Sequence, residues 1–293
     1  MSVQYFAPAS VEEALQLLAG NSDYTLLAGG TDLVPRMNLR QIKVLRGLVY
    51  LGNIAEMKGI TSHNDYIFVG ALVTHSRIAA SELIKEKAPN VWYASYHMGT
   101  PAIRNAGTIG GNLVNASPAG DSCVALLAAD ARVILKSRHE NRLVPVKEFF
   151  VDKGRTVLNP GEILYGVQLP MAGQGIRKGS SYQRIGLLKG SSTAITNVAA
   201  EVEQDGEGVC QACRIAVGAM AGTPLRLAAL EEALAGKKID RDLINQVVKD
   251  VDAWINPIDD TYATAWYRRK VVKVLIKRAL LEASGLEGSE GEV

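Results

Sequence analysis

Apolar residues recur at two alternating spacings through the first 170 residues of the chain. Within 10–18, Val11, Ala14, Leu15 and Leu18 fall on one helical face behind Ser10, which can cap the helix. Short apolar runs typical of strands alternate with helical patterns further along. Strands are predicted at 24–27, 45–53, 66–70 and up to residue 135, and helices from about residue 74, over 91–98 and over 121–129. This alternation indicates an α/β region.

The pattern changes near residues 171–180, where glycines and polar residues mark a domain boundary. Two strands, within 192–206 and 209–222, are joined by a turn at Asp205-Gly206. Helices are then predicted over 223–236, with Thr223 as cap and Pro224 at the first position, over 241–254 and over 267–283. In the last helix, Val271, Val274, Leu275 and Ala279 are expected on one face and Lys273, Lys277 and Arg278 on the other.

Composition excludes several classes of protein. The 293 residues are 47% hydrophobic, which suffices for a sizeable core and two domains. With 32 basic and 30 acidic residues the net charge is +2, so no nucleic-acid surface is expected. The N-terminus lacks the pattern of a signal peptide, and no apolar run approaches the roughly 20 residues of a membrane span. Three cysteines are too few for a disulfide framework, so we expect a reducing, cytoplasmic compartment.

The stretch LLAGGTDLVP, residues 26–35, has two adjacent glycines after an apolar strand. Such a turn either only reverses the chain or presents backbone N–H groups and the Thr31 hydroxyl to an anion. It lacks the Lys of a Walker loop and the third glycine of a dinucleotide fingerprint. Asp32 could accept bonds from ribose or ribityl hydroxyls, or could cap the following turn. The stretch alone leaves these alternatives open.

A second glycine-rich segment, residues 104–121, contains four glycines among amide and hydroxyl side chains. It is either a long surface loop or a loop whose backbone approaches a ligand closely. Neither glycine segment contains Lys, and Arg104 only flanks the second. Backbone donors and hydroxyls would therefore have to neutralise a bound phosphate.

Other candidates for chemistry are weaker. Cys210 and Cys213 have the spacing of a metal or redox pair, but no second pair follows, and residues three apart on a strand point to opposite faces. Cys123 lies in an apolar run and is expected in the core. The histidines are scattered, and only His75, after a strand, could lie near a cleft. No catalytic and no metal-ligating residue is predicted.

Five segments, taken in this order, resemble the FAD-binding medium subunits of the molybdenum hydroxylases, a family that includes xanthine, carbon monoxide and nicotinate dehydrogenases. They are LLAGGTDL, RNAGTIGGNLVNASPAGDS, LNPGEILYGVQLP, VGAMAGTPLRL and AWYRRKVVKVLIKRAL. The resemblance covers residues 3–283. It implies an α+β protein with a two-lobed, p-cresol methylhydroxylase-like FAD-binding region, then a C-terminal domain with a small antiparallel sheet and helices. The implied bounds are 1–174 (lobes 1–60 and 61–174), 175–284, and a tail at 285–293.

The resemblance also implies the FAD site. The turn at 25–32 would hold the pyrophosphate, and 108–112 would close on it from the other lobe. Asp121 matches a contact to the polar chain of the flavin, while Ile163, Leu164 and Tyr182 match positions near the ring. The implied residues are Thr25, Leu26, Leu27, Ala28, Gly29, Gly30, Thr31, Asp32, Thr108, Ile109, Gly110, Gly111, Asn112, Ser117, Asp121, Ile163, Leu164 and Tyr182.

The function implied is that of an electron-transfer flavoprotein subunit. Partners would be a large subunit with a molybdenum cofactor and a small subunit with [2Fe–2S] clusters, allowing a dimer of heterotrimers. Electrons would leave through FAD to NAD⁺, a quinone or another acceptor. Unlike the medium subunit of 4-hydroxybenzoyl-CoA reductase, this chain has no cysteine-bearing insertion for a cluster of its own. The Gly-Gly-Thr-Asp sequence resembles purine- and N-heterocycle-type members, but the substrate is not determined.

Two further hypotheses stay open at the level of sequence. One is a stand-alone flavoenzyme of the p-cresol methylhydroxylase-like fold, which would need an acid or base of its own. The other is a non-catalytic module that binds a phosphate-bearing ligand.

Overall fold

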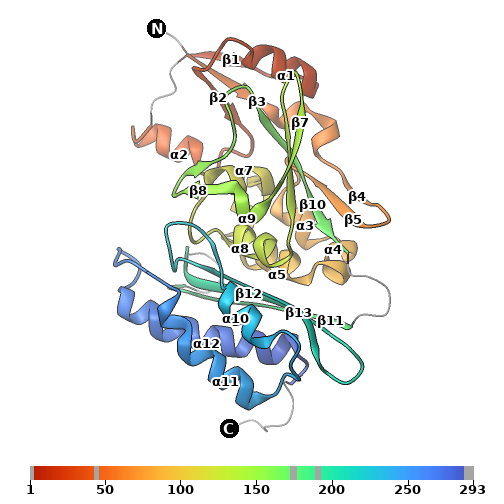
Figure 1. Cartoon of the computed structure of the whole chain (residues 1–293). Helices are drawn as coiled ribbons and strands as arrows, with labels where there is room; N and C mark the ends of the chain where they lie inside the picture. The colour runs from red at the N-terminus through yellow and green to blue at the C-terminus, as the bar shows by residue number, and fades with distance from the viewer. Residues whose placement is uncertain (1–2, 43–45, 172–176, 189–192, 287–293) are drawn as a thin grey trace.

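The N-terminal part of the chain contains a small parallel sheet with one covering helix (Figure 1). A computed structural model describes residues 3–42, 46–171, 177–188 and 193–286. Strands β1 (Gln4–Phe6), β3 (Gly47–Tyr50) and β2 (Tyr24–Leu27) pair in that order, all parallel. Helix α1 (Val11–Leu18) is capped by Ser10, which accepts the N–H of Glu13. It buries the four residues predicted from its periodicity, which confirms that prediction.

A second, antiparallel sheet follows and is completed by a strand from late in the domain. Its order is β4 (Ile60–Ser62), β5 (Tyr66–Gly70), β10 (Ile163–Pro170), β6 (Arg132–Lys136) and β7 (Asn141–Pro145). Strand β10 is central, and Gly166 opposes Gly70 in its register. A Cβ at Gly166 would overlap the Phe68 ring, so the glycine lets that ring lie across the strand. The first residues of β10, Ile163 and Leu164, pair with Lys136 and Leu135 of β6.

Short helices lie between the second sheet and the C-terminal domain (Figure 1). They are α3 (His75–Ala79), α4 (Glu82–Lys87), α5 (Pro89–His97), α6 (Pro101–Ala106), α7 (Ile109–Asn115) and α8 (Asp121–Ala128). Every residue of α8 is buried. The remaining short elements are α2 (Leu33–Asn38), η1 (Leu51–Asn53), η2 (Ala55–Met57), α9 (Val146–Phe149), β8 (Phe150–Asp152) and β9 (Arg155–Thr156).

The C-terminal domain is a four-stranded antiparallel sheet with helices on one face (Figure 1). Strands β11 (Arg177–Gly186), β12 (Ala194–Gln204), β13 (Cys210–Gly218) and β14 (Leu225–Arg226) pair in chain order. Helices α10 (Ala228–Leu234), α11 (Arg241–Lys249) with η3 (Asp250–Ala253), and α12 (Ala265–Ala283) cover it. Val198 of β12 packs in the core under these helices, whereas its neighbour Ala199 packs in the N-terminal core. The sheet is therefore buried on both faces, and the predicted α+β fold is confirmed.

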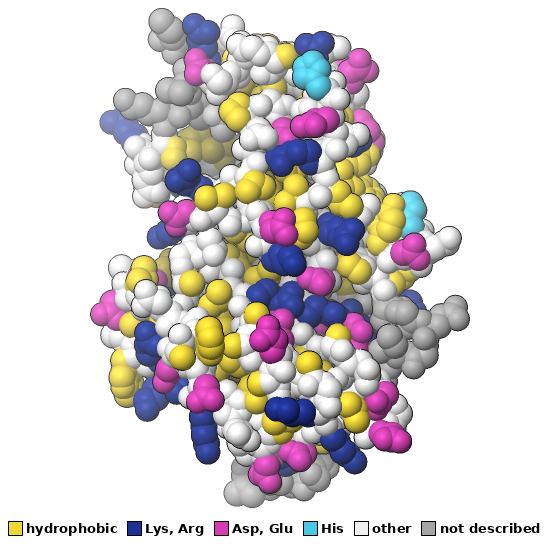
Figure 2. Space-filling view, viewed as in Figure 1, with side chains coloured by type: hydrophobic (Ala, Val, Ile, Leu, Met, Phe, Trp, Pro, Cys, Tyr) yellow, Lys and Arg dark blue, Asp and Glu magenta, His cyan; other side chains and the backbone are white. Residues whose placement is uncertain are grey.

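Charged side chains also meet at the junction of the two domains. Figure 2 shows a group of Lys and Arg side chains there among acidic ones. Lys178 Nζ lies 2.8 Å from Glu201 Oε2, and Arg214 contacts both Glu201 and Glu203. Elsewhere both signs are interspersed, in keeping with the small net charge. In the described part of the chain no helix is long and apolar enough to cross a bilayer.

Three sequence predictions about elements were wrong. The segment 104–121, predicted as a loop, contains parts of α6, α7 and α8, because Thr100 and Thr108 cap the first two of these helices. Thr223 caps no helix, since Leu225 and Arg226 pair with β13 and α10 begins only at Ala228.

The third error concerns the face of α12. Val274 is 49% exposed, and the buried face instead carries Val272, Leu275, Ile276 and Ala279. The face also includes Arg268, which is 2% exposed and bonds both carboxylate oxygens of Asp260. Of the four residues predicted for this face, Leu275 and Ala279 are buried and Val271 packs against the core, so the prediction was wrong only for Val274.

The domain bounds are not decided by these observations. The boundary predicted at 174 lies outside the described residues, as do 287–293 of the predicted tail. The parallel sheet falls within residues 4–50 and the antiparallel one within 60–170. The division into lobes at residue 60, and of the domains at 174 and 284, stays a prediction.

Candidate functional site

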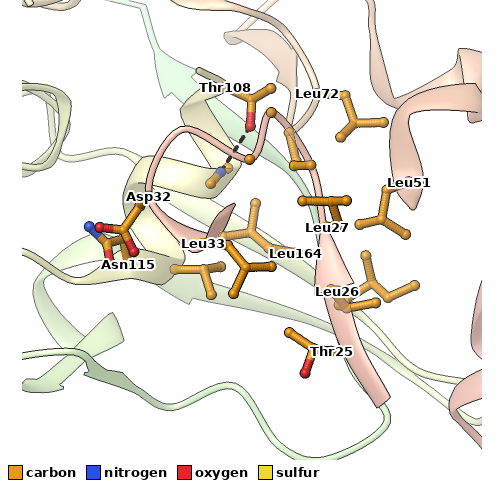
Figure 3. A pocket seen from close by; sticks show the side chains of 18 of the residues that line it. Thr25, Leu26, Leu27, Asp32, Leu33, Leu51, Leu72, Thr108, Asn115 and Leu164 are labelled. Atoms are coloured by element: carbon orange, nitrogen blue, oxygen red, sulfur yellow. Dashed lines mark hydrogen bonds between the residues drawn. The ribbon is translucent and has the colours of Figure 1, made fainter. Parts of the chain in front are cut away.

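A cleft of about 550 Å³ lies between the two sheets of the N-terminal region. One wall is β2 with the glycine turn and α2 that follow it, and the other is α7 with the start of β10. Figure 3 shows Leu26, Leu27, Leu51, Leu72 and Leu164 among the side chains that line it. Polar groups at its edges include Thr25, Asp32, Thr108 and Asn115. The cleft thus combines apolar walls with a few polar groups, as ligand sites commonly do.

The first glycine turn presents unused backbone donors to this cleft. In the described chain, the N–H groups of Gly29, Gly30, Thr31 and Asp32 have no protein acceptor. Gly30 has φ +70°, the left-handed region that glycine adopts without strain. Asp32 precedes α2 but makes no capping bond with its side chain, so of the two roles considered for it the cap is excluded. A run of free amides at a turn of this kind is suited to an anion.

Gly29 brings the two glycine segments together. A Cβ on Gly29 would overlap the carbonyl oxygen of Ala106, at the end of α6, and would lie 3.1 Å from the Cα of Gly107. The turn after β2 therefore packs directly on the backbone that leads into α7. Only glycine permits this approach, so the two walls of the cleft are held at their observed separation by this contact.

The second glycine segment uses its backbone donors inside the protein. Ile109 N–H donates to Val73 O at 3.0 Å and Gly110 N–H to Ala71 O at 2.9 Å. Gly111 N–H donates to the Thr108 side chain at 3.1 Å. The expectation that these amides face an anion from the opposite lobe is therefore wrong. The reason is that β5 continues into residues whose carbonyl groups lie against the start of α7.

The glycines of this segment serve close packing instead. A Cβ at Gly110 would lie 2.6 Å from the Cβ of Ala71, whereas one at Gly111 would meet only the Thr108 hydroxyl oxygen. Gly110 thus seats α7 on the sheet, and Gly111 leaves space on the side of the cleft that it lines. Asn112 Oδ1 accepts the hydroxyl of Ser122 at 2.7 Å, which orients its amide group in the cleft wall.

Most of the predicted site residues line the cleft. These are Thr25, Leu26, Leu27, Ala28, Gly29, Gly30, Thr31, Asp32, Thr108, Gly110, Gly111, Asn112, Ile163 and Leu164. Ile109 is fully buried in the core. Ser117, Asp121 and Tyr182 are not among the lining residues. Whether each residue contacts FAD stays a prediction.

Asp121 and Tyr182 belong to a buried network that joins the two domains. Tyr182 Oη and Arg184 Nε both donate to Asp121 Oδ1, at 2.6 and 2.9 Å. Asn197 Nδ2 donates to the same oxygen at 3.2 Å and to Tyr182 Oη at 3.1 Å. Burial, and then the Asp121 carboxylate, raise the pKa of Tyr182 well above its usual value. Asp121 at the start of α8 therefore anchors β11 and β12, whatever it contributes to a cofactor.

Among the lining residues that the sequence prediction did not include are two with ionisable side chains of interest, Arg36 and His75. Arg36 Nη1 donates to Asp32 Oδ2 at 3.2 Å. The spacing of four residues on a helix that starts at the glycine turn could have predicted that Arg36 shares a face with Asp32. For His75, the position after a strand indicated a place near a cleft, but its burial in the cleft wall depends on contacts with α5 and with the segment before α7.

His75 is 1% exposed and lies in the wall of the cleft. Its backbone N–H donates to Gly107 O at 3.1 Å, and its Nδ1 lies 3.5 Å from Ser95 Oγ. Burial lowers the pKa of His75 to about 4; a bond to the Thr108 backbone opposes this shift, and Arg104 adds to it. The imidazole is therefore neutral at physiological pH and ties α3 to the segment before α7.

This burial predicts an acid-dependent loss of stability. Because the folded pKa is about 4 and the unfolded one 6.5, unfolding takes up a proton between these values, and stability falls as pH drops through that window. The expected contribution is about 3 kcal/mol. Urea titrations at pH 7.5 and pH 4.5 should show a smaller pH dependence for His75→Gln than for the wild type. His63→Gln, at an exposed histidine, is the control and should retain the wild-type dependence.

The cysteines show one further difference from expectation. Cys123 is fully buried in the core, as predicted, and burial raises the pKa of its thiol. Cys210 and Cys213 do not point to opposite faces, because β13 has an irregularity that leaves Gln211 without a partner in the register. Both pack in the C-terminal core. Among the described residues, no group of three or more His, Cys, Asp or Glu side chains is placed to hold a metal ion.

Comparison with known families decides the assignment of the chain. Residues 1–172 match the FAD binding domain in molybdopterin dehydrogenase, and residues 186–283 match the CO dehydrogenase flavoprotein C-terminal domain. The chain belongs to the FAD-binding medium subunits of the molybdenum hydroxylases. It is accordingly an oxidoreductase flavoprotein subunit, and the family resemblance read from the sequence is confirmed.

Individual relatives of this medium subunit match over nearly their whole length. The glyceraldehyde dehydrogenase medium chain of Sulfolobus acidocaldarius is 31% identical over 280 residues, 96% of this chain and 98% of the relative. The xanthine dehydrogenase FAD-binding subunit of Escherichia coli O157:H7 is 26% identical, covering 98% of this chain and 97% of the relative. The structure is similar to carbon monoxide dehydrogenase from Hydrogenophaga pseudoflava, with a TM-score of 0.91, 29% identity, and coverage of 97% and 98%.

The cleft of this medium subunit fits FAD on its own geometry. Free amides follow Ala28, a glycine stands where a Cβ would close the gap to Ala106, and apolar side chains line the walls on either side. The free amides suit a pyrophosphate, and the apolar walls suit a planar ring system. The donor set is neutral apart from Arg36, as expected for a site in which the backbone carries most of the anion recognition.

Proposed function

We propose that this chain holds FAD in the cleft between its two N-terminal sheets and relays electrons through it. The flavin supplies the redox chemistry, accepting electrons from a [2Fe–2S] partner and passing them to NAD⁺, a quinone or another acceptor. The chain itself binds, orients and shields the cofactor. The observation that carries the proposal is the turn at 29–32, whose four free N–H groups face a cleft with apolar walls.

We assign the individual roles as follows. Gly29, Gly30, Thr31 and Asp32 would donate backbone N–H groups to the pyrophosphate. Leu26, Ile163 and Leu164 would pack on the apolar parts of the cofactor. The Thr108 hydroxyl accepts from Gly111 N–H and keeps its own proton to donate into the cleft. No residue of the chain is required to act as a general acid or base.

We further propose that the chain works in a cytoplasmic complex. Relatives are described as medium chains or subunits, among them those of nicotine 6-hydroxylase and carbon monoxide dehydrogenase. By analogy the partners would be a large molybdenum-cofactor subunit and a small [2Fe–2S] subunit, in a dimer of heterotrimers. Co-purification from the native source tests this: two further subunits carrying molybdenum and iron support it, and a lone chain contradicts it.

FAD binding is the direct test of the proposal. The purified full chain, stripped of flavin and incubated with FAD, should regain a visible flavin spectrum after desalting. FMN, which lacks the pyrophosphate, should bind much more weakly. A chain that stays colourless with FAD would contradict the proposal, and one that takes up FMN equally well would contradict the role of the glycine turn.

A stand-alone flavoenzyme remains the second candidate, because a member of this fold could act on its own substrate. Among the described lining residues, the ionisable side chains are Tyr24, Asp32, Arg36 and His75. His75 is buried and bonded within the protein, which leaves no obvious base beside a substrate. Turnover of any reductant by the isolated chain would favour this second candidate.

A further inference from the structure

We propose that Arg36 binds the pyrophosphate of FAD, an inference that rests on the proposed function. Arg36 is the one Lys or Arg among the described residues that line the cleft. The other ionisable side chains that line the cleft are Tyr24, Asp32 and His75, and burial keeps His75 neutral. The cleft as built therefore carries no net positive charge, whereas its proposed ligand is a dianion at the pyrophosphate.

The position of Arg36 suits this role. It lies on α2, which begins directly after the turn with the free amides, and one helical turn beyond Asp32. Its side chain is 45% exposed, so the guanidinium stands at the mouth of the cleft rather than in its floor. A guanidinium there can contact phosphates from the solvent side, while the backbone donors of 29–32 contact them from the cleft wall.

The bonds of Arg36 leave capacity for a ligand. Within the described chain the guanidinium makes one hydrogen bond, from Nη1 to the Asp32 carboxylate at 3.2 Å. A guanidinium has five N–H donors in a rigid fork that matches phosphate oxygens. The Asp32 carboxylate makes no capping bond and is free to hold the arginine in place. Asp32 would thus position Arg36, and part of that ion pair would be exchanged for phosphate when FAD binds.

The alternative is an ordinary surface ion pair between neighbours on a helix. Such pairs contribute little, and removing one would leave ligand binding unchanged. The chain offers a matched case in Arg46, which lies 3.9 Å from Asp23, is likewise exposed, and is not among the lining residues. The two arginines therefore differ in the feature that the proposal requires, their place relative to the cleft.

The experiment compares R36M, R36K and R46M by titrating the flavin-free full chain with FAD. R36M is expected to weaken FAD binding about tenfold, and R36K by less, since a lysine keeps the charge but not the fork. R46M should bind as the wild type does. The affinity of the wild type should also fall more steeply with salt than that of R36M, because one charge contact has been removed.

Competition of ADP and adenosine against FAD distinguishes a direct contact between Arg36 and the pyrophosphate from a general effect of the substitution on the cleft. ADP carries the pyrophosphate, so R36M should weaken ADP binding as it weakens FAD binding. Adenosine should compete equally well in R36M and in the wild type. If R36M binds FAD as tightly as the wild type, or weakens adenosine binding as much as ADP binding, the inference is overturned while the proposed function stands. If the wild-type chain binds no FAD, the proposed function falls, and this inference with it.

Discussion

Replacing Gly29 with alanine is expected to lower the free energy of unfolding by about 3 kcal/mol and to abolish FAD binding. The new Cβ would overlap the carbonyl oxygen of Ala106 and would lie 2.6 Å from its carbonyl carbon. Both are backbone atoms, so no change of side-chain rotamer relieves the overlap. The turn after β2 and the segment before α7 must move apart, and the four donors of the turn move with them.

Urea unfolding and FAD titration of the same preparations measure the two effects. Gly59→Ala is the matched control, because a Cβ there meets no atom within 4 Å and the residue has no positive φ. Gly30→Val should separate binding from stability. Its φ of +70° makes a side chain costly locally, but the nearest atom is a methyl group of the exposed Val34 at 3.1 Å and not a backbone atom, so flavin loss should exceed the loss of stability. Full flavin occupancy in Gly29→Ala would contradict the packing of the two walls.

Removing the carboxylate of Asp121 should destabilise the protein by about 3–5 kcal/mol. In Asp121→Ala, Arg184, whose side chain is 10% exposed, loses the carboxylate that accepts its Nε–H, and the buried Tyr182 hydroxyl loses its acceptor. A buried hydroxyl donor left without an acceptor costs more than the net strength of its bond. Because the partners lie on β11 and β12, the loss falls on the junction of the two domains.

The comparison for this prediction is Asp130→Asn, which removes the charge and keeps a residue that tolerates the φ of 53° at this position. Asp130 is 53% exposed and lies 3.2 Å from Arg226, which keeps a second partner in Glu231. Loss of this charge should cost under about 1 kcal/mol. Chemical denaturation monitored by the fluorescence of the tryptophans would show both values. A loss in Asp121→Ala no larger than in Asp130→Asn would show that the network does not hold the junction.

FAD titration of an Asp121 variant tests whether this residue contacts the flavin in addition to holding the domain junction. Asp121→Asn retains an oxygen that can accept from Tyr182, so the fold should suffer less than in Asp121→Ala. If Asp121 contacts the flavin as the family resemblance implies, Asp121→Asn should weaken FAD binding out of proportion to its stability. If its role is confined to the domain junction, the two losses should scale together.

Features that depend on near neighbours in the chain could be predicted. Ser10 and the face of α1 were predicted correctly, as were β5 at 66–70 and the start of α3 near residue 74. In each case the bonds that define the element are made within four or five residues, or the apolar spacing is uninterrupted. The strand that ends in the first glycine turn could also be predicted, because its apolar residues and the two glycines are adjacent in the sequence.

Features that depend on distant segments were decided only by the tertiary structure. The amides of Ile109 and Gly110 are used because Val73 and Ala71, some 36 to 39 positions earlier, bring carbonyl groups to them. The amides at 29–32 are free because nothing in the described chain packs its acceptors there. Both segments are rich in glycine. The sequence therefore could not show which of them keeps free N–H donors and which serves close packing.

The sequence by itself determined the family, the α+β character and one wall of the cleft, because glycine spacing, caps and periodicity are properties of short segments. Only the tertiary structure decided which amides remain free, that His75 and Arg36 enter the cleft, and that Asp121 joins two domains. The physical reason is that an N–H donor bonded to an acceptor within the protein is not available to a ligand. Whether a donor can serve a ligand therefore depends on every acceptor that folding has placed within its reach.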